Sequence, residues 1–160
     1  MRASISKALI GLLIAAVWNA SASLSVSETA APTRVLFIGN SLTAANDLPA
    51  IVQALARARG QTLDYQTLAY PSYSLSDHWD KGEARAAIAK GHWDIVVLQQ
   101  GPSALEESRE SLIKYTQLFA DEIQRVGARP ALYMVWPTAD RRADFDRVSE
   151  SYRLAAVKVG

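Results

Sequence analysis

Cysteine is absent from this sequence, and histidine occurs only twice, at His78 and His92. The lack of cysteine excludes disulfides, thiolate metal ligands and a lipid-modified cysteine, so the fold depends on core packing alone. Two isolated histidines do not form a metal-ligand cluster, and the glycine spacing of nucleotide-binding loops is missing. We therefore expect neither a bound metal nor another cofactor.

An excess of charge of one sign is also lacking. The sequence has 17 basic and 16 acidic residues. Arg2 and Lys7 precede the first acidic residue, Glu28, so the chain without them has 15 basic residues (17 minus 2) against 16 acidic ones. A near-neutral chain without a basic patch is not expected to bind nucleic acid or an anionic membrane.

The N-terminus has the pattern of a secretory signal peptide. Arg2 and Lys7 are followed by an apolar run of eleven residues, Ala8 to Trp18, and then by the small residues Ala20-Ser21-Ala22. The run is shorter than the roughly 20 residues that span a bilayer. We predict a signal peptide at residues 1–22, cleavage after Ala22, a secreted or periplasmic protein and no stable membrane anchor. An uncleaved N-terminal anchor is the alternative.

The remaining chain is predicted to form one domain, because 160 residues leave room for little more. Residues 23–33 are small and polar and indicate a flexible lead-in, so the domain is expected to span 34–160. The expected strands are 35–38, 63–69, 94–98 and 131–135, and the expected helices are 47–59, 80–90, 108–126 and a last one from 144. Continuous apolar strands that alternate with helices indicate an α/β fold with a parallel sheet covered on both faces.

Catalytic groups of open parallel sheets gather in the loops after the carboxyl ends of the strands. The first such loop, Gly39-Asn40-Ser41-Leu42-Thr43, places a serine directly after a buried strand and a turn-forming glycine. The N–H groups of the following turn could stabilise an oxyanion there. Ser41 is therefore a candidate nucleophile, and its alternative role is that of a helix N-cap.

Four blocks of this sequence resemble the SGNH (GDSL-type) hydrolases, in the order in which that family carries them. They are Ile38 to Thr43, Ser74 to Trp79, Trp93 to Ser103 and Tyr133 to Pro137. The resemblance covers the chain from Arg34 onward and implies a flavodoxin-like three-layer α/β/α sandwich. It also implies that Ser41 is the nucleophile of an ester hydrolase that works through an acyl-enzyme.

The resemblance further suggests which groups would bind the oxyanion. The family uses the N–H of the serine, a glycine N–H after the second strand and an asparagine side chain after the third. The second donor falls on Ser72, which replaces the glycine and can still donate its N–H. The third falls in the region of Gln100, Gly101 and Ser103, where an amide or a hydroxyl would have to take the place of the asparagine.

The general base of the family is a histidine in a late Asp-x-x-His block after a fifth strand, and neither histidine here lies in such a block. We therefore expect the last strand and the catalytic block to be absent from this chain, and the chain alone to be inactive. His78 is expected at the mouth of the second loop, as a substrate-binding residue or as a surface or interface histidine beside Trp79. His92 precedes the third strand and is expected to be structural.

Three further residues are assigned to the wall of a substrate pocket. They are Asn40, Tyr73 and Trp136. Tyr73 and Trp136 lie in loops after strands, where aromatic side chains bind ligands about as often as they simply pack.

These observations predict an exported serine hydrolase whose partner is a small-molecule or carbohydrate ester: an acetylated carbohydrate, a lipid or a small ester. The alternative is a non-catalytic protein on the same fold that binds a glycan or another small ligand. The missing base and the missing asparagine favour the binding protein, whereas the order of the four blocks favours the enzyme.

The mature protein is expected to begin at Ser23, because Ala20-Ser21-Ala22 is the one well-placed cleavage pattern after the apolar run. N-terminal sequencing of exported material checks this expectation. Membrane-bound protein that still carries residues 1–22 would contradict both the cleavage and the export.

Overall fold

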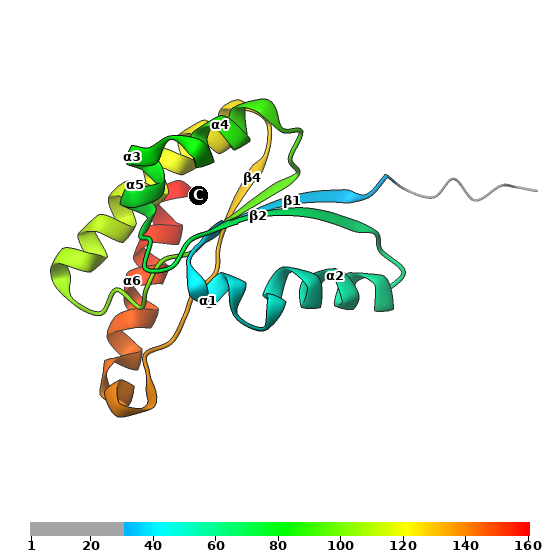
Figure 1. Cartoon of the computed structure of the whole chain (residues 1–160). Coiled ribbons are helices and arrows are strands. Elements are labelled where there is room, and N and C mark those ends of the chain that lie inside the picture. Colours follow the sequence, from blue (N-terminus) through cyan, green and yellow to red (C-terminus); the bar gives the residue numbers. More distant parts are fainter. Residues whose placement is uncertain (1–30) are drawn as a thin grey trace, which may run out of the picture.

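The computed structural model describes residues 31–160, and the predicted signal peptide and most of the predicted lead-in lie outside this range. The chain forms an open sheet of four strands in the order β2-β1-β3-β4, with every neighbouring pair parallel (Figure 1). The strands are β1 (Thr33–Gly39), β2 (Leu63–Ala69), β3 (Ile95–Leu98) and β4 (Arg129–Leu132). The predicted α/β fold with a parallel sheet is confirmed.

Helices cover both faces of this sheet, as Figure 1 shows. On one side lies α2 (Leu48–Ala58), which follows the short α1 (Ser41–Ala44) and the 3₁₀ turn η1 (Ala45–Asp47). On the other side lie α3 (Leu75–Lys81), α4 (Glu83–Lys90), α5 (Glu106–Arg125) and α6 (Phe145–Val159), the last preceded by the 3₁₀ turn η2 (Ala139–Asp144). Among residues 31–160 no helix is long and apolar enough to cross a membrane.

The central strand β1 explains this layering. Leu36 and Ile38 are fully buried in the main core, which they share with side chains from α3, α4, α5 and α6. Val35 and Phe37 are also buried but point to the opposite face, because successive side chains alternate along a strand. A strand buried on both faces has to be apolar at every position, and the run Val35 to Ile38 meets this condition.

The larger departures from the predicted elements are at α3 and β4, whereas the other elements differ by no more than three residues at either end. Helix α3 was not predicted, although Ser74 and Asp77 form a capping box at its start and Gly82 ends it with a φ of 78°. Strand β4 begins and ends earlier than the predicted 131–135. Its partner β3 ends at Leu98, which pairs with Leu132, so the chain beyond Tyr133 has no strand to bond to.

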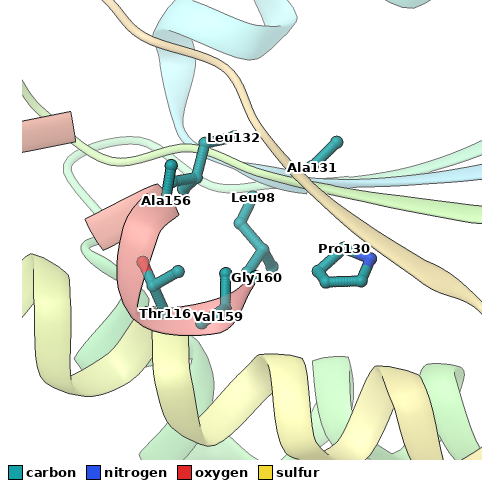
Figure 2. A pocket seen from close by; sticks show the side chains of 8 residues that line it. All are labelled: Leu98, Thr116, Pro130, Ala131, Leu132, Ala156, Val159 and Gly160. Atoms are coloured by element: carbon teal, nitrogen blue, oxygen red, sulfur yellow. The ribbon is translucent and has the colours of Figure 1, made fainter. Parts of the chain in front are cut away.

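Strand β4 is the last strand of the sheet and borders a small apolar hollow of about 240 Å³ (Figure 2). Its walls come from β3, β4, α5, α6 and the residue that follows α6: Leu98, Thr116, Pro130, Ala131, Leu132, Ala156, Val159 and Gly160. The hydroxyl of Thr116 is buried and finds no hydrogen-bond partner within residues 31–160. The packing of the sheet against α5 and α6 is therefore less complete at β4 than at β1.

Candidate active site

Ser41 lies at the start of α1, directly after the central strand, and its side chain is exposed. The N-cap of this helix is Asn40, whose side-chain oxygen accepts the N–H of Leu42 at 3.0 Å. The alternative role of Ser41 as the cap is therefore wrong. Neither the hydroxyl nor the N–H of Ser41 has a hydrogen-bond partner in the part of the chain that the structure describes.

The loop that carries Ser41 is held by the fully buried side chain of Gln99. Gln99 Oε1 accepts the N–H of Asn40 at 2.9 Å and the hydroxyl of Thr43 at 2.7 Å. Gln99 Nε2 donates to the carbonyl of Gln100 at 2.7 Å, so the carboxamide of Gln99 is bonded at both ends. Gln99 was not predicted to be a site residue, and its place directly after a buried strand was the one signal in the sequence.

Asn40 also ties the first loop to the second. Its Nδ2 donates to the carbonyl of Tyr73 at 2.9 Å, and the side chain is 7% exposed. We expected Asn40 in the wall of a substrate pocket, but its oxygen and its nitrogen are both used to hold the two loops. Ser41 and Ser72 therefore each lie one residue from this connection.

Ser72 has a φ of 63°, the left-handed conformation that glycine adopts without strain. A serine in this conformation costs about 1 kcal/mol relative to glycine. The side chain is exposed, and the N–H has no hydrogen-bond partner among residues 31–160. Ser72 thus adopts a backbone conformation that favours glycine, the residue that the resemblance implies at this position.

The side chains expected to supply a third donor are already bonded to the protein. Gln100 Nε2 donates to the hydroxyl of Ser103 at 2.9 Å and to the carbonyl of Ser108 at 3.3 Å. The hydroxyl of Ser103 donates in turn to the carbonyl of Gly101 at 3.0 Å. In the described part of the chain, the N–H of Gly101 remains without a hydrogen-bond partner. This backbone group, unlike either side chain, is therefore a free donor of the loop.

His78 lies in the core and not at the mouth of the second loop, so its predicted surface position is wrong. The ring is 2% exposed, and its Nε2 lies 2.7 Å from the carbonyl oxygen of Gly39, which requires a proton on Nε2. The rings of Tyr70 and Tyr73 pack against the imidazole, with centroid distances of 5.8 and 5.1 Å. Burial lowers the pKa of His78 below its ordinary value. His92 is exposed and precedes β3, at the other end of the strands.

A groove of about 510 Å³ lies beside Ser41. Leu42 forms one wall, and the segment after β4 and the start of α6 form the rest: Trp136, Pro137, Thr138, Ala139, Arg142 and Phe145. Trp136 is 67% exposed, which fits its predicted place in a pocket wall. Ser41 precedes Leu42 in the chain and does not itself line the groove.

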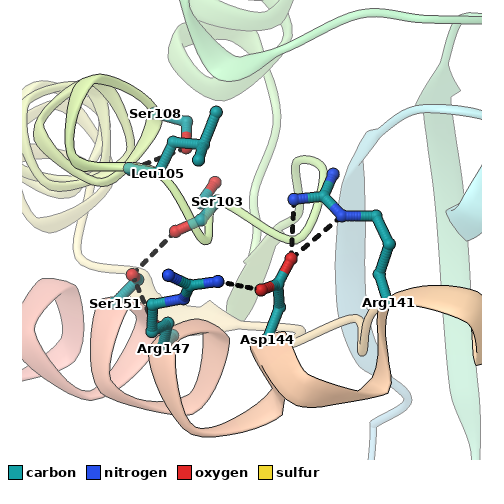
Figure 3. Close-up of polar contacts among 7 residues, drawn as sticks. All are labelled: Ser103, Leu105, Ser108, Arg141, Asp144, Arg147 and Ser151. Carbon is teal, nitrogen blue, oxygen red and sulfur yellow. Dashed lines mark hydrogen bonds and ion pairs between the residues drawn. The ribbon is translucent and has the colours of Figure 1, made fainter.

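A second hollow, of about 290 Å³, lies on the other side of Pro137 and Thr138 and includes Ser103 and Asp144 in its lining. Asp144 pairs with Arg141 at 2.6 Å and also with Arg147 (Figure 3). The bond from Arg147 is the main cause that lowers the pKa of Asp144. These contacts fix the turn that separates the two hollows. Nowhere in residues 31–160 do three or more His, Asp or Glu side chains gather as a metal site would require.

Comparison with solved structures places this geometry in a known class. A candidate SGNH hydrolase from Slackia heliotrinireducens is 25% identical, with a TM-score of 0.71 over 81% of this chain and 77% of that one. A lipase/acylhydrolase from Enterococcus faecalis is 18% identical, with a TM-score of 0.58 over 79% and 70%. The acetyl xylan esterase AlAXEase is 16% identical, with a TM-score of 0.57 over 78% and 73%.

The fold is thus that of hydrolases with an open parallel sheet, and the neighbours named by activity act on esters. The chain belongs to the SGNH hydrolase superfamily, as the four sequence blocks predicted. By sequence alone, no family model and no curated protein matches it.

Replacement of Gly39 by alanine is expected to destabilise the fold by about 1–3 kcal/mol, because the new methyl group would collide with Thr43 Oγ1 and Gln99 Oε1. Urea unfolding measures this loss. Gly101→Ala is the matched control, since a methyl group there meets nothing within 4 Å, and it should change stability by less than about 0.5 kcal/mol. Equal effects of the two substitutions would contradict the proposed packing of Gln99 against Gly39.

Burial of His78 predicts a loss of stability on mild acidification. Because the folded pKa lies below the unfolded value of about 6.5, the unfolded chain takes up the proton first. Stability is therefore full above about pH 6.5 and falls below it, by at most about 1.4 kcal/mol per pH unit. Urea unfolding at pH 7.5 and 5.5 checks this. His78→Gln should reduce the difference and His92→Gln should not; an unchanged difference in His78→Gln would refute the assignment.

Proposed function

We propose that this protein is a serine esterase in which Ser41 is the nucleophile. The single observation that carries the proposal is the placement of Ser41: exposed, first in a helix after the central strand, with a hydroxyl free of protein partners in residues 31–160. Attack of Ser41 Oγ on an ester carbonyl would release the alcohol and leave an acyl-enzyme. Water would then release the acid and restore the hydroxyl.

Three backbone N–H groups are suited to bind the oxyanion of this reaction. They belong to Ser41, Ser72 and Gly101, and each lacks a partner among the described residues. The loops that carry them are joined by the bonds of Asn40 to Tyr73 and to Gln99. Fixed donors of this kind typically contribute about 10²- to 10³-fold each to the rate. We assign the third donor to Gly101 N–H in place of the side chains of Gln100 and Ser103.

The proton acceptor for Ser41 is not found among the two imidazoles of the chain. His78 is buried and already donates to Gly39, and His92 lies at the opposite end of the strands. We propose that turnover requires an imidazole from outside these residues and that the 160 residues alone are inactive. General-base assistance typically supplies about 10²- to 10⁴-fold, and a neutral hydroxyl without it is a poor nucleophile.

We further propose an exported enzyme, with residues 1–22 as its signal peptide, that acts on an acetylated carbohydrate, a lipid or a small ester. The acetyl xylan esterase and the lipase/acylhydrolase among the neighbours support this range of substrates. A non-catalytic ligand-binding protein on the same fold is the second candidate. It is favoured by one observation: the side-chain donors after β3 serve the protein itself.

In a chain that includes a base, Ser41→Ala is expected to lower kcat for p-nitrophenyl acetate by about 10³-fold or more without loss of folding. The reason is that no other hydroxyl takes its place after β1. Ser111→Ala, which removes a hydroxyl from α5, is the control and should keep its activity.

The same assay on the 160-residue chain is expected to give background rates. Near-wild-type turnover by folded Ser41→Ala would sink the nucleophile assignment. Turnover that depends on Ser41 in the 160-residue chain would instead overturn the need for an imidazole from outside these residues. A chain with a base that shows no turnover at all would favour the binding protein.

A further inference from the structure

The groove beside Ser41 has an apolar lining that contains one charged side chain. Three of the large hydrophobic residues that remain exposed in the described chain meet in it: Leu42, Trp136 and Phe145, with 43%, 67% and 47% of their surface accessible. Its volume of about 510 Å³ lies within the range of roughly 300–1,000 Å³ that is usual for small-molecule sites. Exposed apolar side chains that gather around one hollow are typical of a binding site.

Arg142 is the charged residue of this lining, and its guanidinium forms no ion pair within residues 31–160. Its two arginine neighbours differ from it, because Arg141 and Arg147 both bind Asp144 (Figure 3). The groove thus keeps a free cation at a turn where the other cations are neutralised. The binding of Asp144 also holds η2 and the start of α6, which supply most of the wall, in place.

The polar groups that a sugar would need are missing from this lining. Sugar hydroxyls are held by several placed hydrogen-bonding groups, yet no carboxylate or carboxamide lines the groove. Its one hydroxyl, that of Thr138, faces Asp140 and lowers the pKa of that carboxyl. The remaining chemistry is an apolar surface and one guanidinium, which recognises a carboxylate or phosphate through charge-assisted hydrogen bonds.

We propose that this groove binds an aliphatic chain that carries one anionic group, so that the preferred substrates are anionic acyl esters rather than acetylated sugars. The chain would lie against Leu42, Trp136 and Phe145, and the anion would be bound by Arg142. The binding itself does not depend on the proposed function. The step from ligand to substrate rests on that function, in which Ser41, the residue before Leu42, is the reacting group.

The test is a titration followed by ¹H–¹⁵N NMR with four probes: octanoate, octanol, acetate and xylobiose. Octanoate should shift the indole N–H of Trp136, identified by its absence in Trp136→Phe, and the amide of Ser41. Octanol should bind more weakly than octanoate. Acetate and xylobiose should give no saturable shift, because the first lacks a chain and the second lacks both recognised groups.

Arg142→Gln should weaken octanoate binding by about tenfold and leave octanol binding unchanged, since it removes only the cation. Arg59→Gln, which removes an exposed charge at the end of α2, is the matched control and should change neither. Equal affinity for octanoate and octanol, an unchanged octanoate affinity in Arg142→Gln, or saturable xylobiose binding at Trp136 would overturn the proposal. No turnover is needed, so failure here is separate from failure of the esterase assay.

Discussion

The buried carboxamide of Gln99 joins the end of the sheet to the first loop. It accepts from the Asn40 N–H and the Thr43 hydroxyl and donates to the carbonyl of Gln100. A buried polar group left unpaired costs about 1–3 kcal/mol, so these contacts are strongly favoured to persist together. The carboxamide also packs against Gly39, where no side chain fits. The direction in which the chain leaves the central strand, and hence the place of Ser41, follows from this one group.

The second loop reinforces the same arrangement from the other side of β1. The carbonyl of Gly39 accepts the ring N–H of His78 and the backbone N–H of Tyr70, while Asn40 donates to Tyr73. Polar side chains that would normally point into an active site are here hydrogen-bonded to backbone groups of the protein. The groups left over for chemistry are mainly backbone N–H groups and one hydroxyl. An oxyanion site built in this way tolerates changes of side chain as long as the backbone angles are kept.

The parallel sheet was predictable because runs such as Val35 to Ile38 are apolar without interruption. Such runs are typical of strands that are buried on both faces, as the strands of parallel sheets are. Helix α3 was missed because most of its residues are polar, and its capping box was the better signal. The helical stripe of α2 was only partly informative, since Ile51 and Leu55 remain 45% and 63% exposed. The partners of Gln100 and His78 were beyond prediction, because they depend on where side chains from different loops point.

The position of Pro130 has a consequence for how this sheet can meet other chains. The N–H groups of Arg129 and Tyr133 donate to the carbonyls of Asp94 and Leu98, on the β3 side of β4. Backbone groups alternate in direction along a strand, so the N–H of Ala131 also points toward β3. The outward positions of β4 are then Pro130 and Leu132, and proline has no N–H to offer. A strand from another chain would find one backbone donor along the free edge of β4, the N–H of Leu132. This edge is therefore a poor template for aggregation through strand pairing.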